Sequence, residues 1–507
     1  MKKIMTRLLS LVLLGAFIPS FVLAETWDLG KGDITVTATE TSQTVSQVNG
    51  ETKDDPDPVI TSSSGKTNNT VTITAEKNAT ANVTLENVNI DTGTRGGAAI
   101  TTSGEGNVNI ELNGTNTVQS GNTHAGVEKK GDGTLTITDE NKDGSLTATG
   151  GNYGAGIGGG YEGSGSNIAI EGGKVKAIGG THGAGIGGGF GGSGSNIAIE
   201  GGKVEASSSG GGAGIGGGSL GSGSNIAVSG GEVTAQGGVG GAGIGGGQGG
   251  SGSKITISDG KVTATGAGAG AGIGGGYAGS GEGITIEGGE VTAQGDAGGA
   301  GIGGGISGTG SDVTISGDAQ VKVQGGTTGR DWHKGAAIGN GGTPTTDGNE
   351  VSPNTSDLKV GGFIQIYEPG KNINTDTPDR TIEGQKGDHS WNAGEVTTAE
   401  TVPESKAAAY WVSDSQGQSI PYQAQQKDGV LTVTVQADTA YLRGTTGSLG
   451  QLEAQGIAEI RFVTNGAQSA FTLSDLLTSG TGSFTLTHDG DKVTFTLENT
   501  DISGILK

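Results

Sequence analysis

The chain has 507 residues, of which 109 are glycine, about three times the share of ~7% that is usual in proteins. Only 31% of the residues are hydrophobic and 4% aromatic, which excludes an ordinary globular core of several hundred residues. The net charge of −23 makes nucleic acid and anionic lipid poor partners, and the nine prolines exclude collagen. A disordered chain or a repeat fold with a narrow core remains.

Residues 1–24 have the pattern of a secretory signal peptide. Three basic residues, the last of them Arg7, precede the short apolar run LLSLVLLGAFI, and the letters VLA fit a cleavage site before Glu25. After cleavage, 26 basic and 52 acidic residues remain, a net charge of −26. The apolar run is too short to span a membrane. We therefore expect a secreted protein, extracellular or at the cell surface, without membrane insertion and without disulfides, since cysteine is absent.

Residues 25–70 are predicted to form cap strands for the repeats that follow. They contain the alternating segment DITVTAT and the acidic turn DDPDP. A stack of repeats needs such a cap, because an open sheet edge would pair with other chains.

The motif GAGIGGG occurs six times at a spacing of 29 residues. Within each unit apolar residues alternate, as in Ile168 and Ile170, which favours strands, and EGGK or SGGE supplies a glycine corner between them. Three short strands per unit predict one coil of a parallel β-helix, right-handed by the usual crossover rule. The isoleucines of the six motifs are Ile157, Ile186, Ile215, Ile244, Ile273 and Ile302.

Stacking the coils places equivalent residues about 4.8 Å apart. Ile168 is then predicted to lie over Ile197 in an apolar ladder, with Ile215 pointing inward and Ala227 outward. We expect about nine coils between Val71 and Ile338, within a β-helix that spans residues 71–345.

Glycine-rich turns also occur in calcium-binding β-rolls, but their GGxGxD pattern is missing here. The turns read GGGYEGSGS or GGGFGGSGS and lack the aspartate that would bind the ion, which excludes a β-roll. Gly156 and Gly158 are expected to point outward. A face almost without side chains would admit a flat partner closely, although tight corners would demand the same glycines.

The order NVNIELNGTNTVQSG, HAGV, GTLTI, GSLTATGG, GAGIGGG and NIAIEGGKVKAIGG resembles secreted bacterial carbohydrate-binding β-helix proteins. The resemblance covers about residues 30–340. It implies a pectate-lyase-like right-handed parallel β-helix that binds polysaccharide without cleaving it. It implies no particular binding residue, because most of the matching residues are core or corner positions.

The 29-residue period stops after Ile338, and residues 346–405 are predicted to be an irregular linker. Residues 406–507 show alternating segments such as LTVTVQ and KVTFTLEN with DG turns, which predict a small antiparallel β-domain. The predicted fold class is therefore all-β: a parallel β-helix followed by an antiparallel domain.

The residue after each GGG is the first candidate for ligand binding. Tyr161, Phe190 and Tyr277 occupy this corner position in three coils, and Tyr161 and Phe190 belong to adjacent coils. Aromatic faces offer platforms for sugars. Alternatively, the rings stack on each other and simply cover the corner.

Acidic residues suggest two other sites. Glu171 and Glu200 would lie about 5 Å apart on consecutive coils, a separation typical of a retaining glycosidase, but lysines in the same corners favour a solvated surface cluster. Asp139, Asn141 and Asp143 resemble the first half of a calcium loop, in which glycine replaces the glutamate expected at the twelfth position. Calcium is the one cofactor that the sequence suggests.

The sequence thus predicts an exported, non-catalytic β-solenoid that binds polysaccharide along its long axis. An enzyme is not expected, because the five histidines never stand at metal-ligand spacing and the repeats contain almost no arginine. The alternative is a structural or adhesive stalk whose C-terminal domain engages a partner at the cell surface. The two predictions differ in which part of the chain binds.

Overall fold

The computed structural model describes residues 24–507, apart from 49, 51, 328–332, 356, 360, 385–409, 415–419, 421, 428, 447–451, 453–456, 481 and 498–499. The predicted signal peptide, except for its last residue, lies outside the described residues. No helix in the described part of the chain is long and apolar enough to cross a membrane.

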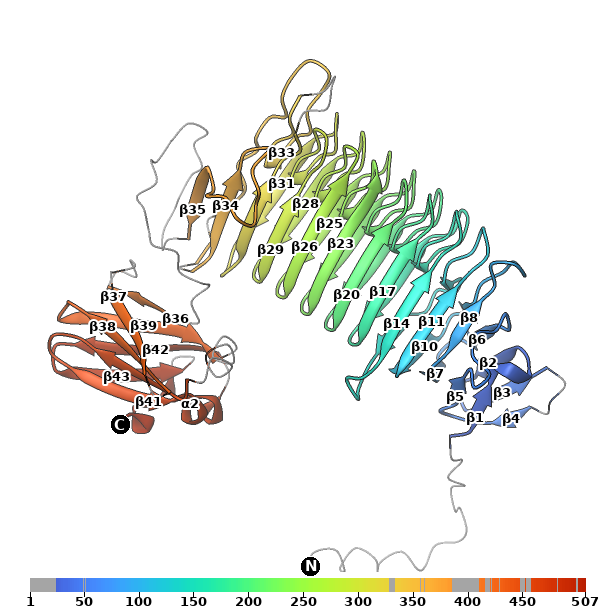
Figure 1. Ribbon diagram of the computed structural model, residues 1–507, viewed down its shortest axis with the longest axis horizontal. Helices are drawn as coiled ribbons and strands as arrows, with labels where there is room; N and C mark the ends of the chain where they lie inside the picture. Colours follow the sequence, from blue (N-terminus) through green and yellow to red (C-terminus); the bar gives the residue numbers. More distant parts are fainter. Residues whose placement is uncertain are drawn as a thin grey trace, which may run out of the picture.

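Three long sheets wind together into a rod, and successive coils contribute their strands in turn (Figure 1). Sheet A contains β1 Thr26–Asp28, β5 Val59–Thr61, β7 Thr80–Glu86, β10 Asn107–Asn113, β13 Leu135–Thr138, β16 Gly165–Ile170, β19 Gly194–Ile199, β22 Gly223–Val228, β25 Gly252–Ile257, β28 Gly281–Ile286 and β31 Gly310–Ile315. Sheet B contains β2 Ile34–Ala38, β3 Gln43–Gln47, β4 Lys53–Asp54, β6 Val71–Ala75, β9 Ile100–Ser103, β12 Val127–Lys129, β15 Ile157–Gly158, β18 Ile186–Gly187, β21 Ile215–Gly216, β24 Ile244–Gly245, β27 Ile273–Gly274, β30 Ile302–Gly303 and β33 Ile338–Gly339. Sheet C contains β8 Asn89–Asp91, β11 Thr115–Gln119, β14 Ser145–Thr149, β17 Lys174–Gly179, β20 Lys203–Ser208, β23 Glu232–Val239, β26 Lys261–Ala267, β29 Glu290–Gln294, β32 Gln320–Gln324, β34 Phe363–Tyr367 and β35 Arg380–Glu383.

The core of the rod consists of apolar ladders one residue wide. Ile186 pairs with Ile157 on one side and with Ile215 on the other, and all three are fully buried. In sheet A, Ile168 pairs with Ile197, as the 29-residue spacing predicts. The predicted parallel β-helix is therefore confirmed, because equivalent residues of successive coils do lie over one another.

The parallel stack extends beyond both predicted ends. In the cap region, β2 pairs in parallel with β6, and only β3 and β4 run antiparallel. At the other end, β34 pairs in parallel with β32, and antiparallel β35 covers it. The boundary at 345 is thus too early, and part of the expected irregular linker belongs to the rod. The loop that precedes Phe363 breaks the 29-residue period, so the period alone does not predict this last strand.

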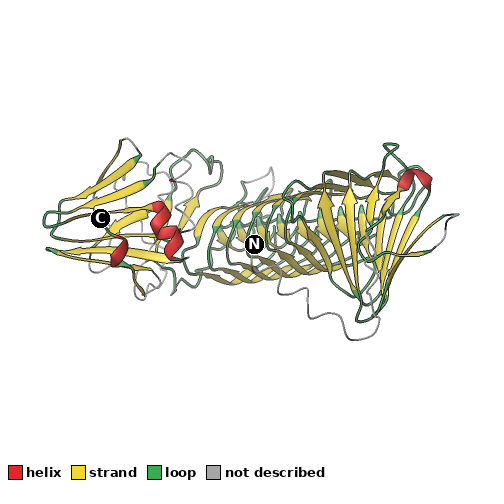
Figure 2. Ribbon diagram, turned by 90° about the horizontal axis from the view of Figure 1, so that it is seen from below, coloured by secondary structure: helices red, strands yellow, loops and turns green. Residues whose placement is uncertain are grey.

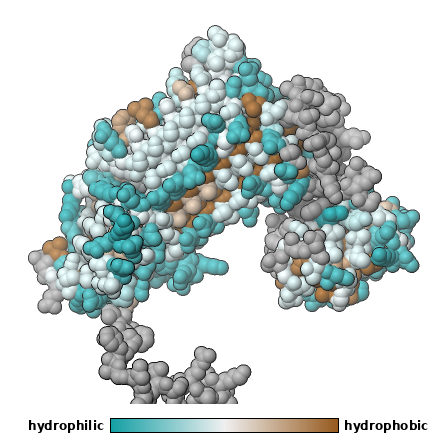
Figure 3. Space-filling view, turned by 180° about the vertical axis from the view of Figure 1, so that it is seen from behind, coloured by the Kyte–Doolittle hydropathy of each residue, from teal (hydrophilic) through white to brown (hydrophobic). Residues whose placement is uncertain are grey.

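The glycines of the GAGIGGG strands do not form the outward face that the alternation predicts. Gly156 and Gly158 are buried. Gly158 has a φ of +134°, and a Cβ built on it would lie 2.0 Å from the carbonyl oxygen of Gly187. These glycines are therefore required because neighbouring coils approach through their backbones. Figure 3 shows a broad pale area on one face of the rod, the colour of residues with intermediate hydropathy.

The C-terminal domain has two sheets around a core of its own. One sheet pairs β36 Tyr410–Ser413, β39 Thr439–Thr445, β42 Ser483–Asp489, β43 Lys492–Leu497 and β44 Thr500–Asp501, all antiparallel. The other contains β37 Tyr422–Lys427, β38 Val430–Val435, β40 Glu459–Val463 and β41 Gln468–Thr472. The predicted antiparallel domain is confirmed, with one parallel pair, β38 and β40, inside it.

Helices contribute little to the described structure. Figure 2 shows the layers of the rod as strands, with few helical turns. The helices are η1 Leu29–Lys31, α2 Leu473–Ser479 and η3 Ser503–Ile505.

Candidate functional site

Two rows of residues run side by side along the rod, one just before the strands of sheet B and the other just after them. One row lies four residues before the inward isoleucine of each coil, and the other lies four residues after it. The backbone N–H of Phe190, in the second row, donates to the carbonyl oxygen of Tyr153, in the first row of the preceding coil, at 2.9 Å. The same bond joins Tyr161 to Thr123 at 2.7 Å. Because this bond repeats, the rows stay in contact.

Four rings from two neighbouring coils gather on these rows, and we call them the aromatic cluster: Tyr153, Tyr161, His182 and Phe190. The rings of Tyr161 and Phe190 are stacked, with centroids 5.7 Å apart and planes 14° apart. Tyr153 and His182 form a second stack at 5.2 Å and 12°. Edge-to-face contacts of 5.5 Å between Tyr153 and Tyr161 and of 5.3 Å between His182 and Phe190 join the two stacks. Such geometries are the favourable ones for aromatic pairs.

The aromatic cluster faces solvent mainly through Tyr161, which is 47% exposed. The other three rings are half-buried. The neighbouring carboxylate of Glu162 raises the pKa of Tyr161 through its charge and a hydrogen bond, which further disfavours the phenolate. The stacked rings of Tyr161 and Phe190 therefore present an uncharged aromatic surface.

Tyr277, the third aromatic candidate, lies apart from the cluster. Ser219 and Gln248 occupy the same corner position in the coils between Phe190 and Tyr277. Tyr277 is 39% exposed, but no ring in the described residues contacts it. The structure thus brings together two of the three predicted aromatic residues, and the aromatic surface is local rather than continuous.

The corner that joins sheet B to sheet A becomes longer beside the aromatic cluster. In the coil of β12, the chain passes from inward Val127 to inward Leu135 in eight residues, whereas the next coil takes eleven, from Ile157 to Ile168. The longer corner extends past the shorter one and leaves a step. At this step lies a hollow of about 680 Å³, which we call the step hollow. It is lined by Thr123, His124, Glu128, Lys129, Lys130, Gly131, Asp132, Gly160, Tyr161, Gly163, Ser164 and Ser166.

Glu128 organises the charged side of the step hollow. It pairs with Gly158 in the register of sheet B, so that a carboxylate stands where the later coils have glycine. Its Oε2 accepts hydrogen bonds from His124 Nδ1 at 2.7 Å and from the backbone N–H of Ala125 at 3.1 Å. Its Oε1 lies 2.8 Å from Lys130 Nζ. These three partners compensate the burial of the carboxylate.

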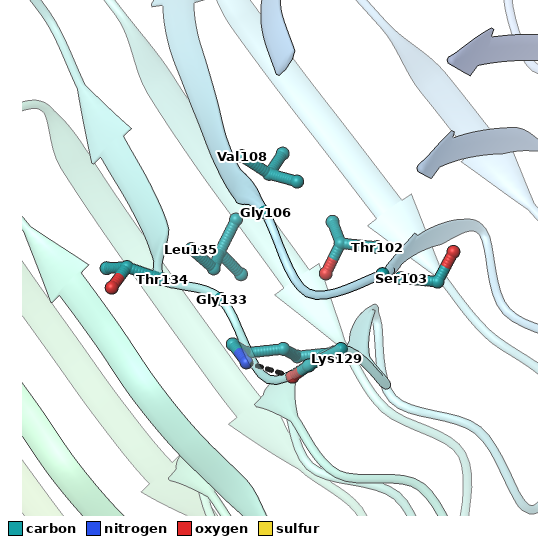
Figure 4. Close-up of a pocket in the computed structure, with 10 residues that line it drawn as sticks. Thr102, Ser103, Gly106, Val108, Lys129, Gly133, Thr134 and Leu135 are labelled. Carbon is teal, nitrogen blue, oxygen red and sulfur yellow. Dashed lines mark hydrogen bonds between the residues drawn. The ribbon is translucent and has the colours of Figure 1, made fainter. Parts of the chain in front are cut away.

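Lys129 separates the step hollow from a second, much smaller cavity. Figure 4 shows its side chain folded back so that Nζ donates to the carbonyl oxygen of Gly131. Burial lowers the pKa of Lys129. The small cavity measures about 10 Å³, which at most admits one water molecule. The step hollow is the larger and therefore the better candidate for a ligand.

The calcium candidates form a turn rather than a cluster of ligands. The Oδ1 atom of Asp139 accepts a hydrogen bond from the backbone N–H of Gly144 at 3.1 Å, and Asn141 and Asp143 are exposed. In the described part of the chain, no three acidic, histidine or cysteine side chains gather as metal ligands. Asp139 therefore closes the turn between β13 and β14.

Glu171 and Glu200 are both exposed at their corners. The adjacent ladder is mixed in charge: Lys203 pairs with Glu232 of the next coil, with Nζ and Oε2 3.5 Å apart. This arrangement is typical of a solvated surface.

The sequence prediction missed half of the aromatic cluster and the charged residues beside it. Tyr153 and His182 are 29 residues apart, and both stand four residues before an inward isoleucine. This spacing is the signal that would have found them. Glu128 breaks the glycine pattern of its corner, which marks the shorter coil.

The comparison with known families bears on the repeats of the rod. A family model described as Beta helix repeat matches residues 142–161, 168–190, 197–219, 226–248, 255–277 and 284–306. The rod contains beta helix repeats. The first two matched segments end at Tyr161 and Phe190, the stacked pair of the aromatic cluster. No match was found among curated proteins or among solved structures.

Proposed function

We propose that this protein is an exported, non-catalytic protein that binds polysaccharide through the aromatic cluster. The observation that carries the proposal is the stack of Tyr161 on Phe190, partly exposed beside the step hollow. An exposed aromatic face removes the C–H face of a sugar ring from water, while the polar edges of the sugar stay free for hydrogen bonds. The location of the cluster on two coils favours binding at one place rather than along the whole rod.

The surroundings of Glu128 support binding rather than catalysis. An acid or base for glycan cleavage needs a carboxyl oxygen directed at the substrate. Both oxygens of Glu128 are instead engaged by His124, Ala125 and Lys130. The carboxylate therefore serves to shape the step hollow.

The start of the fold supports export. The backbone nitrogen of Glu25 donates to Oδ2 of buried Asp55 at 3.1 Å. Cleavage before Glu25 would turn this nitrogen into an ammonium group, which strengthens a hydrogen bond to a carboxylate. The first strand begins one residue later, at Thr26.

Affinity gel electrophoresis tests the proposed function. Gels that contain neutral polysaccharides such as xylan, galactomannan and mixed-linkage glucan, or acidic ones such as polygalacturonate and alginate, should include at least one that retards the mature protein. Replacing both Tyr161 and Phe190 by alanine should abolish the retardation, because the stacked platform is removed. Tyr277→Ala, the matched control on the same corner, should leave it unchanged.

The proposal is wrong if no gel retards the protein, or if the double variant and the control behave alike. The adhesive-stalk alternative would then gain support if cells still retain the protein. That alternative rests on the C-terminal domain, whose core is separate from the core of the rod.

A further inference from the structure

The corner between β15 and β16 is the first of the long corners, and we call it the first long corner. Its backbone lacks hydrogen-bond partners that the equivalent corners of the later coils have. In later coils, the N–H of the last glycine of GAGIGGG donates to a carbonyl oxygen of the preceding corner, as Gly189 does to Gly163 at 3.0 Å and Gly218 to Gly192 at 3.1 Å. Gly160 occupies this position in the first long corner. The preceding corner is too short to supply the acceptor, and no acceptor for Gly160 occurs in the described part of the chain.

Two more backbone groups of the first long corner lack the hydrogen-bond partner that their equivalents have in later coils. The carbonyl oxygen of Phe190 accepts from the N–H of Glu162 in the preceding coil at 2.8 Å, but the carbonyl oxygen of Tyr161 has no such donor among the described residues. The N–H of Ser193 donates to Oγ of Ser164 at 3.3 Å, whereas the N–H of Ser164 has no equivalent acceptor there. In the repeating coils all three bonds point toward the preceding coil. In the first long corner that side is the step hollow, which Gly160, Tyr161 and Ser164 line.

The charges that line the step hollow balance. Lys129 and Lys130 oppose Glu128 and Asp132, and His124 is hydrogen-bonded to Glu128. A ligand with a net charge would gain little there from the field of the hollow. Unpaired backbone donors and an acceptor beside an aromatic ring instead suit a ligand that carries hydroxyl groups on an apolar ring.

We propose that the step hollow binds a short segment of a neutral saccharide, with one sugar ring on Tyr161 and its hydroxyl groups on the unpaired backbone groups of the first long corner. This inference rests on the proposed function and adds the place and the class of the sugar. The volume of about 680 Å³ falls within the range of roughly 300–1,000 Å³ found for small-molecule sites. The change in corner length thus determines where along the rod the ligand binds.

Filling the step hollow tests this inference. Asp132 is exposed, and its backbone is held by bonds from its N–H to the carbonyl oxygen of Gly104 and from Asn167 Nδ2 to its own carbonyl oxygen. Asp132→Trp should therefore fold and place an indole in the hollow. Asp143→Trp, at an exposed aspartate of another turn, is the matched control. Thermal unfolding followed by circular dichroism checks that both variants fold.

Calorimetric titration with neutral oligosaccharides of two to four sugars, cut from the polysaccharide that retards the protein, gives the readout. We expect Asp132→Trp to weaken binding at least tenfold, about 1.4 kcal/mol, and Asp143→Trp to leave it unchanged. Equal affinity of the wild type and Asp132→Trp would overturn the inference, and so would tighter binding of uronate oligosaccharides than of neutral ones. If Tyr161→Ala/Phe190→Ala still abolishes retardation in the gel, the proposed function survives that failure.

Discussion

Ile215 shows how strictly the rod separates inside from outside at the level of single residues. It is fully buried between Ile186 and Ile244 of the adjacent coils. Ala227, in the same coil, is exposed. A charge at the first position would have only aliphatic neighbours, whereas a charge at the second would be hydrated.

Ile215→Asp should lower the free energy of unfolding by roughly 3–5 kcal/mol, the cost of an uncompensated buried charge. Each coil contacts only its neighbours, so the damage should open the rod locally and expose this region to proteases. Ala227→Asp should change stability by less than about 0.5 kcal/mol. Limited proteolysis and urea denaturation compare the variants, and equal resistance of the two would refute the inward position of Ile215.

For single residues, the sequence predicts those positions that the 29-residue period determines. The ladders of isoleucines and the adjacency of Tyr161 and Phe190 follow from the 29-residue spacing, and the structure confirms them. The burial of Gly158 could not be predicted from alternation, because it depends on how closely the backbone of the next coil approaches. The pairing of Tyr153 with His182 depends likewise on two rows that are separate in sequence.

The cap is the element that closes the N-terminal end of the rod. Its DDPDP turn buries Asp55, whose Oδ2 accepts a hydrogen bond from Trp27 Nε1 at 2.8 Å in addition to that from Glu25. The turn thereby ties β1 to the segment that leads into β5. Asp57, two residues later, is exposed.

Asp55→Ala should lower the free energy of unfolding by about 1–3 kcal/mol, because it leaves the buried indole N–H of Trp27 without an acceptor. Asp57→Ala is the control and should stay within about 0.5 kcal/mol of the wild type. Hydrogen exchange should locate the loss in β1 and β5. Unchanged protection of these strands in Asp55→Ala would contradict the role of the turn.

The position of the cap was predictable from its turn residues, but the last strand of the rod was not recognised. Phe363–Tyr367 has the alternation of a strand, yet it follows an inserted loop and falls out of the period. The step hollow was hidden for a related reason. It arises from a difference of three residues between two corners, which has no consequence until the coils are stacked.

Along the whole molecule, the proposed binding site lies where the rod departs from its own repeat. Eleven strands of sheet A follow one another in parallel, a stack of about 50 Å. The step hollow lies at the coil boundary between β12 and β15, and the aromatic cluster spans the next boundary, between β15 and β18. A rod that bound a polymer along its axis would carry the aromatic residue in every coil, whereas Ser219 and Gln248 interrupt that row.

The stoichiometry of binding distinguishes a single site at the step of the rod from a row of sites along it. Calorimetric titration of the full-length protein with a neutral oligosaccharide of the retained polysaccharide should give one molecule bound per chain, and no binding to the Tyr161→Ala/Phe190→Ala variant. Several equivalent molecules per chain, or one molecule bound as tightly by the double variant as by the wild type, would contradict a single site at the step of the rod.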